Sequence, residues 1–486
     1  MSKVVIANSI GIDSEGNYLI PYPSRWTASV KRSPFIFYPW ELAYLSSLLK
    51  ENTDHEVKFL DGCLYRWDYS TYREKIIKEN PQWLIIESSS RTIEEDRKLA
   101  AEVKKECNTK LIFCGQHPSV YPEEVLQDAD YVCQGEYEFT VLELLKGKGP
   151  RMIDGLYPNK RRELLDVTML PWPEDSDVKR IDYGLTPLPG CRYLQIQMYA
   201  TRGCPLGCNY CVCAHVYYQK PNWRCREISD IIAEVKYLKD KYPQMEGIFF
   251  DEEFHNAHKK FILALCNALI KNGFHNFKNT SMGAYYTLDR EIMEAMKEAG
   301  YYQLRFGIET ASEAVAKKIG LGPKYNLKKL LEILKIGNEI GLEMYGTFTM
   351  GSLGATREDD LKTIQLIKEL LKDGLLKEMQ VSVCTPQPGT PFFKEAEQKG
   401  YLVTNDWRAF DGSIGAVLSM PWYSKQDIDK MHQLAVDTGH YYRGLYQLKS
   451  QGFFSIATRA VKRVGIIGII KHFIRRLTNR HILNKI

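Results

Sequence analysis

The sequence lacks the long apolar runs of an integral membrane protein. No stretch reaches the roughly 18 uninterrupted apolar residues that a membrane-spanning helix needs. The chain passes from Met1 directly into the strand-like segment Val4–Ala7, so we expect no signal peptide. The hydrophobic fraction of 44% and the charged fraction of 26% are typical of a soluble globular protein. We therefore expect a cytoplasmic protein.

A disulfide framework is also missing. The 12 cysteines are scattered along the chain, except for four that lie between residues 204 and 213. This distribution indicates a reducing compartment and metal chemistry rather than disulfide bonds. At 486 residues, the chain is too long for one ordinary hydrophobic core, so we expect two or three domains.

Acidic residues are absent from Ser455 to the C-terminus. Eight basic residues lie there: Arg459, Lys462, Arg463, Lys471, Arg475, Arg476, Arg480 and Lys485. Subtracting these eight charges from the net charge of +5 leaves about −3 for the rest of the chain, which does not suggest a nucleic-acid-binding enzyme. The apolar segment Val464–Ile470 and the basic residues after it predict a short amphipathic helix. Such a helix can lie on an anionic membrane surface or pack on the protein, and the sequence leaves both open.

Three cysteines, Cys204, Cys208 and Cys211, lie close together at the spacing C-x3-C-x2-C within ATRGCPLGCNYC. Thiolates are soft ligands suited to iron–sulfur clusters or zinc, and ligands this close in sequence must lie on a loop that surrounds the metal. Gly203 and Gly207 allow the backbone to turn tightly there. Three cysteines leave one iron of a four-iron cluster without a ligand from this loop, and a substrate or cofactor can bind that iron.

A structural zinc site is the alternative interpretation of the same loop. Its fourth ligand would be Cys213, Cys225 or His215, since small groups of cysteine and histidine often bind zinc.

The segment TRGCPLGCNYC resembles the cluster loop of the radical S-adenosylmethionine (radical SAM) enzymes. This resemblance implies that Cys204, Cys208 and Cys211 hold a [4Fe–4S] cluster, whose fourth iron is chelated by the amino and carboxylate groups of SAM. Cys213 departs from the family pattern, and we interpret it as a small buried thiol.

Residues 1–150 alternate between strand-like and helix-like segments. The strands are predicted at Val4–Ala7, Val57–Leu60, Trp83–Ile86 and Lys110–Cys114, and a helix at Pro39–Leu49. Such alternation predicts a Rossmann-like, doubly wound parallel sheet, which binds ligands at the carboxyl ends of its strands.

This half of the chain resembles the cobalamin-binding domain that is fused to many radical SAM proteins. The resemblance implies cofactor contacts after the third and fourth strands and beyond them, at Ser88, Thr92, Gly115, Gln116, His117, Gly135 and Glu136. The family motif that supplies a histidine to cobalt, D-x-H-x-x-G, is absent, because Asn8–Asp13 contains no histidine. We expect His117 to have a packing or phosphate-tail role. The alternative is a vestigial Rossmann-like module that no longer holds cobalamin.

Residues 151–190 form a proline-rich linker, and residues 191–400 again alternate between strands and helices. The predicted strands are Tyr193–Tyr199, Gly247–Phe250, Tyr302–Thr310, Met344–Gly351 and Met379–Val383. By resemblance, this region is an α/β domain, a partial (β/α)6 barrel with its site at the carboxyl ends of the strands. Residues 401–486 are expected to form a small, mostly helical C-terminal region.

The candidate SAM contacts follow from the same resemblance. Asp251 and Glu252 end one strand, in the position that lies near the amino group of SAM. Gly307 and Glu309 lie on the strand that resembles the SAM-contacting fourth strand of the family, and Met350 ends the fifth. The alternative for the acidic residues is a solvated loop.

The resemblance implies that an electron from an external donor of the flavodoxin or ferredoxin type enters the cluster and cleaves SAM. The 5′-deoxyadenosyl radical then removes a hydrogen atom from an unactivated carbon. With cobalamin, the implied outcome is methyl transfer to a small-molecule or lipid substrate. The alternatives are ring closure or oxidation, as in the anaerobic porphyrin-ring cyclases, and a metal-binding scaffold or electron carrier. The sequence assigns no catalytic side chain and no particular substrate.

Overall fold

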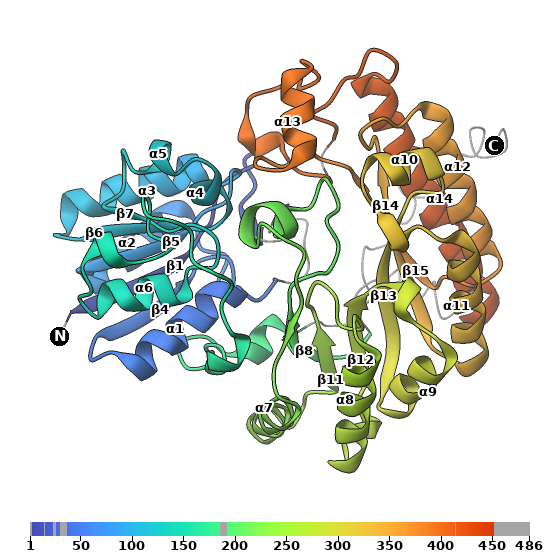
Figure 1. The fold of residues 1–486 in the computed structure, drawn as a ribbon, viewed down its shortest axis with the longest axis horizontal. Coiled ribbons are helices and arrows are strands. Elements are labelled where there is room, and N and C mark those ends of the chain that lie inside the picture. Colours follow the sequence, from blue (N-terminus) through green and yellow to red (C-terminus); the bar gives the residue numbers. More distant parts are fainter. Residues whose placement is uncertain are drawn as a thin grey trace, which may run out of the picture.

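The computed structural model describes residues 2–13, 15–22, 26–29, 36–184, 192–413 and 415–451. Two sheet-containing domains lie side by side, and a helical C-terminal region packs on the second of them (Figure 1). The basic segment that begins at Ser455 lies outside the described residues, so its amphipathic helix stays a prediction.

The N-terminal domain contains a parallel five-stranded sheet with the order β4-β1-β5-β6-β7. Its strands are β1 (Lys3–Asn8), β4 (Glu56–Asp61), β5 (Trp83–Glu87), β6 (Lys110–Cys114) and β7 (Tyr131–Val132). This order places a topological switch point between β1 and β5, which is where doubly wound sheets bind ligands. The predicted Rossmann-like sheet is thus confirmed. The small hairpin of β2 (Leu19–Tyr22) and β3 (Trp26–Ser29) was not predicted.

Helices cover this sheet because its strands are apolar on both faces. Val4, Val5 and Ile6 of β1 are fully buried. Helix α1 (Trp40–Asn52) packs against α6 (Glu138–Leu145), and α2 (Tyr69–Glu79) packs against α3 (Ile93–Glu106). The short helices α4 (Gln116–Val120) and α5 (Pro122–Val125) follow the carboxyl end of β6.

The second domain contains six parallel strands in the order β15-β14-β13-β12-β11-β8. They are β8 (Gln195–Met198), β11 (Gly247–Phe250), β12 (Asn279–Gly283), β13 (Tyr301–Glu309), β14 (Glu343–Met350) and β15 (Glu378–Val383). The connecting helices are α7 (Ile228–Lys241), α8 (Lys259–Lys271), α9 (Arg290–Glu298), α10 (Glu313–Lys318), α11 (Leu327–Ile340) and α12 (Arg357–Lys372). The expected partial barrel is confirmed.

The last barrel strand is followed by α13 (Pro391–Gln398), and the C-terminal region contains α14 (Lys425–Gln451). Helix α14 packs on α12 and β15, and so closes the outer side of the barrel's last unit. Among the described residues, no helix has both the length and the apolar character needed to cross a bilayer.

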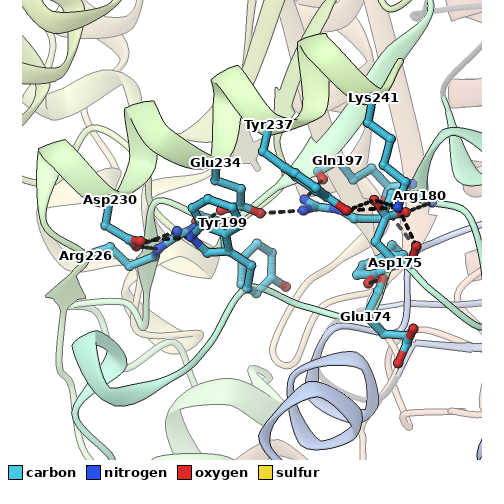
Figure 2. Close-up of polar contacts among 12 residues, drawn as sticks. Glu174, Asp175, Arg180, Gln197, Tyr199, Arg226, Asp230, Glu234, Tyr237 and Lys241 are labelled. Atoms are coloured by element: carbon cyan, nitrogen blue, oxygen red, sulfur yellow. Dashed lines mark hydrogen bonds and ion pairs between the residues drawn. The ribbon is translucent and has the colours of Figure 1, made fainter. Parts of the chain in front are cut away.

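The predicted linker forms a buried network of charges that joins the two domains (Figure 2). Arg180 and Arg226 each pair with one carboxylate oxygen of Glu234 on α7, and the Glu234 side chain is fully buried. Arg180 Nη2 also donates to the carbonyl of Gln197 at 2.9 Å. The linker is therefore fixed to the barrel at the carboxyl end of β8.

The same segment is fixed to the N-terminal domain. Glu174 accepts hydrogen bonds from Ser46 Oγ at 2.6 Å and from Lys50 Nζ at 2.5 Å, both on α1. Asp175, next in sequence, accepts from Tyr237 Oη of α7 at 2.9 Å. We call residues 174–180, with Arg226 and Glu234, the strap. The strap holds α1 and α7 at a fixed separation.

Candidate functional site

The carboxyl edges of the two sheets face each other across the domain boundary. Gln116, just after β6, donates from Nε2 to the carbonyl of Pro388, after β15, at 3.2 Å. Arg91, after β5, pairs with Asp411 of the C-terminal region at 2.7 Å, and both side chains are buried. Ligands held at the carboxyl ends of the two sheets would therefore meet at this boundary.

The cysteine loop follows β8 and starts with a short ribbon, in which β9 (Thr201–Arg202) pairs with β10 (Arg224–Cys225). Gly203 has φ = 99°, and a Cβ atom there would lie 2.2 Å from Asn222 Oδ1, so the position requires glycine. Its amide donates to Glu253 Oε2 at 3.0 Å, and the Asn222 amide donates to the carbonyl of Cys204 at 2.9 Å. The first cysteine is thus held from both strands of the ribbon.

The thiols of Cys204, Cys208 and Cys211 lie close enough to influence one another. Burial raises the pKa of Cys204 to about 12 and that of Cys208 to about 11, and the charge of the Cys211 thiolate adds to both shifts. Within the described part of the chain, no three side chains of Cys, His, Asp or Glu have metal-binding geometry, these thiols included. Iron would replace three thiol protons and draw the sulfurs together. Three soft donors on one loop fit a [4Fe–4S] cluster with one open iron.

The residues considered as a fourth zinc ligand have other contacts. Cys213 is buried, as predicted, and its Sγ lies 3.8 Å from Glu253 Oε1. His215 Nε2 lies 3.1 Å from the carbonyl oxygen of Cys208. Cys225 lies in β10, opposite Thr201. None of the three contacts tests the zinc interpretation.

The acidic run after β11 is buried, so its interpretation as a solvated loop was wrong. Asp251 and Glu252 are 1% and 0% exposed. Glu252 Oε2 accepts from the Ala200 amide at 2.9 Å, and its Oε1 pairs with His255, whose Nε2 lies 2.7 Å from Tyr301 Oη. Glu252 thus ties β11 to the start of the cysteine loop, and both Asp251 and Glu252 stay predicted SAM contacts.

The carboxyl end of β13 carries a buried ion pair beside the cysteines. Glu309 adopts φ = 67° and pairs with Lys324 at 2.7 Å. A Cβ atom on Gly307 would lie 2.1 Å from Glu309 Oε1, so the missing side chain makes room for this pair. The charge of Lys324 opposes the effect of burial on the pKa of Cys208. Sequence reasoning missed Lys324, because it lies 15 residues after Glu309 in a segment without a recognisable motif.

Met350, the fifth-strand candidate, is fully buried at the end of β14. Its carbonyl accepts a hydrogen bond from the Cys384 amide at 2.8 Å. The structure therefore places Met350 at the same carboxyl edge as Glu309, as the resemblance implied.

Buried hydroxyl groups lie at the switch point of the N-terminal sheet. Ser9 Oγ donates to Asp96 Oδ1 at 2.6 Å, and Ser88 Oγ donates to Asp96 Oδ2 at 2.5 Å. Thr92 Oγ1 accepts from the Ser89 amide at 3.1 Å. Burial raises the pKa of Asp96 to about 7. Two predicted cofactor residues, Ser88 and Thr92, are thus brought together over one buried carboxyl group.

The loop after β6 packs against the loop after β5. Gly115 lies against the backbone of Ser88, and Gln116 Oε1 accepts from the Ser90 amide at 2.8 Å. His117 Nδ1 lies 2.9 Å from Ser90 Oγ, and burial lowers the pKa of His117 to about 4. These contacts are those of a packed, neutral imidazole.

The last two predicted cofactor residues lie at the domain boundary. The Gly135 amide donates to Ser119 Oγ at 2.9 Å. Glu136 pairs with Arg202 at 3.2 Å and with Arg224 at 2.8 Å, both of them in the ribbon that carries the cysteine loop. The Glu136 carboxylate is therefore used in contacts between the domains, which the sequence did not predict.

Polar atoms at the carboxyl end of β5 fit a cofactor with many amide groups, such as the corrin ring of cobalamin. In the part of the chain that the structure describes, the buried polar atoms without a hydrogen-bond partner include Glu41 Oε2, Glu87 Oε1, Tyr137 Oη and Tyr217 Oη. Buried polar groups are normally paired, so unpaired ones indicate a missing partner. Together with the switch point beside β5, they fit cobalamin.

Comparison with protein families matches both halves of the chain. The model of the radical SAM superfamily matches residues 198–367, and the model of the B12 binding domain matches residues 27–145. The chain is therefore a radical SAM protein with a B12-binding domain, an enzyme class that uses a [4Fe–4S] cluster, SAM and cobalamin.

Its relatives narrow the group further, to methyltransferases and cyclases. An uncharacterized methyltransferase of Pyrococcus horikoshii is 26% identical over 416 residues, which are 81% of this chain and 85% of the relative. The anaerobic magnesium-protoporphyrin IX monomethyl ester cyclase of Synechocystis is 23% identical over 389 residues, 76% of this chain and 75% of the relative. The solved structure of the radical SAM methyltransferase TsrM from Kitasatospora setae shares the fold, with a TM-score of 0.64 and 16% identity over 83% of this chain and 77% of that one.

Proposed function

We propose that this protein is a cobalamin-dependent radical SAM methyltransferase that methylates an unactivated carbon. The observation that carries the proposal is the opposition of the two carboxyl edges, where Gln116 of one domain contacts Pro388 of the other at 3.2 Å. For such a reaction, the residues that would hold cobalamin and those that would hold the cluster have to face one substrate carbon. The opposed edges bring the two candidate cofactor sites to one boundary. The methyltransferase relative supports the same function.

The chain's own residues bind and orient the groups that react. Cys204, Cys208 and Cys211 would hold the cluster, and Asp251 and Glu309 would contact SAM together with Gly307 and Met350. On the other side, Ser88, Thr92 and the Gly115–His117 loop would contact cobalamin. The bound cofactors supply the radical and methyl-transfer chemistry, while the buried boundary excludes water from it.

The test uses anaerobically reconstituted protein with SAM that carries a deuterated methyl group. A methyltransferase of this kind consumes SAM in two ways, so S-adenosylhomocysteine and 5′-deoxyadenosine should both form under reducing conditions. The deuterated methyl group should appear in the product of an accepted substrate. Formation of 5′-deoxyadenosine alone, without methyl transfer to any acceptor, would contradict the proposal.

Ring closure or oxidation is the second candidate function, and the cyclase relative favours it. A cyclase would form 5′-deoxyadenosine without incorporating the labelled methyl group into its product. The same assay therefore separates the two functions.

We further propose a cytoplasmic location, an electron donor of the flavodoxin or ferredoxin type, and peripheral membrane contact through the basic segment from Ser455.

Basic residues near an anionic bilayer contribute about 1 kcal/mol each to binding. Co-sedimentation with anionic vesicles, comparing the full chain with a version that ends before Ser455, tests the contact. Equal and poor sedimentation of both forms would contradict it, and added salt should weaken a true electrostatic contact.

A further inference from the structure

Arg202 crosses the domain boundary from a position two residues before the first cluster cysteine. Its Nη1 donates to Glu138 Oε1 at 2.6 Å and to Glu136 Oε1 at 3.2 Å. Glu138 begins α6 of the N-terminal domain, and its side chain is fully buried, while that of Arg202 is 3% exposed. Hydrogen bonds between buried ionised groups are short and directional, so this contact fixes the two backbones relative to each other.

A second arginine adds another ion pair across the domain boundary. Arg224 lies opposite Arg202 in the β9–β10 ribbon, and its Nη1 donates to Glu136 Oε2 at 2.8 Å. Glu136 therefore joins both strands of the ribbon, with one carboxylate oxygen on each arginine. The Arg202 guanidinium also lies 5.4 Å from the ring centre of Tyr44 on α1. The ribbon is thus held by two helices of the N-terminal domain. We call Arg202, Arg224, Glu136 and Glu138 the clamp.

The clamp and the cluster loop are adjacent in the backbone, so the position of the clamp fixes the position of the loop. Only Gly203 separates Arg202 from Cys204, and its conformation is fixed by the contact with Asn222 and by the bond to Glu253. The Cys204 carbonyl is bonded to the Asn222 amide, two residues before Arg224. A shift of either arginine would therefore move Cys204.

We infer that the clamp positions the cluster relative to the cobalamin domain, with Arg202 as its central positioning residue. The inference rests on the proposed function, in which both cofactors act on one substrate. Reacting groups must be placed accurately, since a displacement of about 1 Å can lower a rate about 100-fold. The clamp fixes the position of the cluster loop directly. The strap instead fixes the separation of the two domains, through α7 and the linker.

The experiment compares conservative changes in the clamp and in the strap. Glu138→Gln removes one buried charge from the clamp, and Arg202→Lys keeps the charge but loses the planar fork. Glu234→Gln is the matched control, because Glu234 is equally buried and pairs with two arginines, one of which, Arg180, belongs to the linker. Each holo-protein is reconstituted anaerobically with iron, sulfide and cobalamin, and its iron and corrin contents are measured.

The first readout is magnetic. With the cluster reduced and cobalt divalent, both centres are paramagnetic, and their dipolar coupling falls with the cube of the distance between them. We expect Arg202→Lys and Glu138→Gln to keep the cluster but to shift or broaden this coupling. Glu234→Gln should lower the melting temperature and leave the coupling unchanged.

Hydrogen exchange of the amides in residues 203–211 is a second readout that needs no corrin. Exchange should rise in the two clamp variants and stay at the wild-type level in Glu234→Gln. The third readout is the ratio of the two SAM products, in which S-adenosylhomocysteine should fall about 10- to 100-fold relative to 5′-deoxyadenosine in the clamp variants.

Unchanged coupling and unchanged exchange in folded clamp variants would overturn the inference. Equal changes in Glu234→Gln would also overturn it, because the effect would then belong to domain contact in general. Should wild-type protein form no S-adenosylhomocysteine, the proposed function would fail, while the coupling and the exchange would still decide whether the clamp positions the cluster.

Discussion

The strap and the clamp join the same two domains with buried arginine–glutamate pairs, yet they differ in how completely their polar atoms are paired. In the strap, Glu234 uses both carboxylate oxygens, and Arg226 reaches Asp230 as well (Figure 2). Only Arg180 Nε lacks a hydrogen-bond partner within the described part of the strap. A network this complete needs no ligand, so the strap is a structural connection.

The clamp and its surroundings are incomplete by the same measure. In the region that the structure describes, the buried atoms without a hydrogen-bond partner there include Arg202 Nη2, Arg224 Nη2, Glu138 Oε2, Glu41 Oε2, Glu87 Oε1, Tyr137 Oη, Tyr217 Oη and Thr201 Oγ1. Leaving such atoms unpaired costs free energy, and proteins accept this cost chiefly at functional sites. The contrast indicates that the clamp side of the boundary is built around cofactors and the strap side is not.

The largest expected effect is the loss of the cluster. We expect it only from changes on the clamp side of the domain boundary and not from changes in the strap. Replacing Cys204, Cys208 and Cys211 with alanine should abolish bound iron and sulfide, because the thiolates are the only ligands that the loop offers. Iron and sulfide are measured in anaerobically purified protein. The control is Cys266→Ala, a buried cysteine of α8, which should keep its iron. A full cluster in the triple variant would transfer the ligand role to other residues.

Breaking the strap should instead cost stability without loss of the cluster. Glu234→Ala leaves Arg180 and Arg226 buried and without their shared carboxylate, which should lower the free energy of unfolding by about 3–5 kcal/mol. The control is Asp230→Asn, since the Asp230 side chain pairs with the same Arg226 but is 43% exposed. Its expected cost is below about 1 kcal/mol. Urea unfolding measures both, and equal costs would show that the strap does not hold the domains together.

Measuring stability against pH should distinguish the strap from the cofactor side of the boundary. The pKa of a buried carboxyl group is raised on the cofactor side and lowered in the strap. Burial raises the pKa of Asp96 at the cofactor side to about 7, from a usual value of 3.8. Burial alone would also raise the pKa of Glu174 in the strap, but hydrogen bonds, first of all from Lys50, lower it to about 2 from 4.5. The Asp96 contribution to stability is therefore present below pH 3.8 and lost as the pH rises to about 7. The Glu174 contribution is present above pH 4.5 and lost as the pH falls towards 2.

Two isosteric variants should each abolish one of these two pH-dependent changes in stability. Asp96→Asn should flatten the decline in stability between about pH 4 and pH 7, and Glu174→Gln should flatten the decline below about pH 4.5, each by roughly 2–4 kcal/mol at 1.36 kcal/mol per pH unit. Unfolding midpoints across the pH range measure the effect. If Asp96→Asn leaves the decline in stability between about pH 4 and pH 7 unchanged, the Asp96 carboxyl group is not the group that titrates in this range.

The fold could be predicted well where strands are apolar and continuous. The segments predicted for β1, β4, β5 and β6 match the observed strands, because each is a run of branched or aromatic residues. Strand β12 was missed, since Asn279–Gly283 reads NTSMG and has almost no strand signal of its own. Its position is set by β11 and β13 on either side. Tertiary pairing, rather than local sequence, makes it a strand.

The candidate site could be predicted only in part. Cysteine spacing predicts the cluster loop, because the three candidate ligands lie within eight residues of sequence. Contacts between distant residues left no such signal. Glu136 and Arg202 are 66 residues apart, and neither has a neighbour in sequence that predicts their pairing. Lys324 was missed for the same reason, since only the three-dimensional fold brings it beside Glu309.

The smallest expected effect concerns His117, which lies on the cofactor side and whose buried Nε2 has no hydrogen-bond partner, although it lies 3.7 Å from Glu124 Oε1. Its Nδ1 lies 2.9 Å from Ser90 Oγ, and its ring packs against Tyr121 and Trp407. Burial lowers the pKa of His117 to about 4, so the imidazole is neutral at physiological pH. We expect His117→Gln to retain corrin with an unchanged absorbance spectrum. Cob(II)alamin bound to the wild type should show no nitrogen superhyperfine splitting in its paramagnetic resonance spectrum. Such a splitting, lost in His117→Gln, would make His117 an axial ligand and place it with the cofactor-dependent residues.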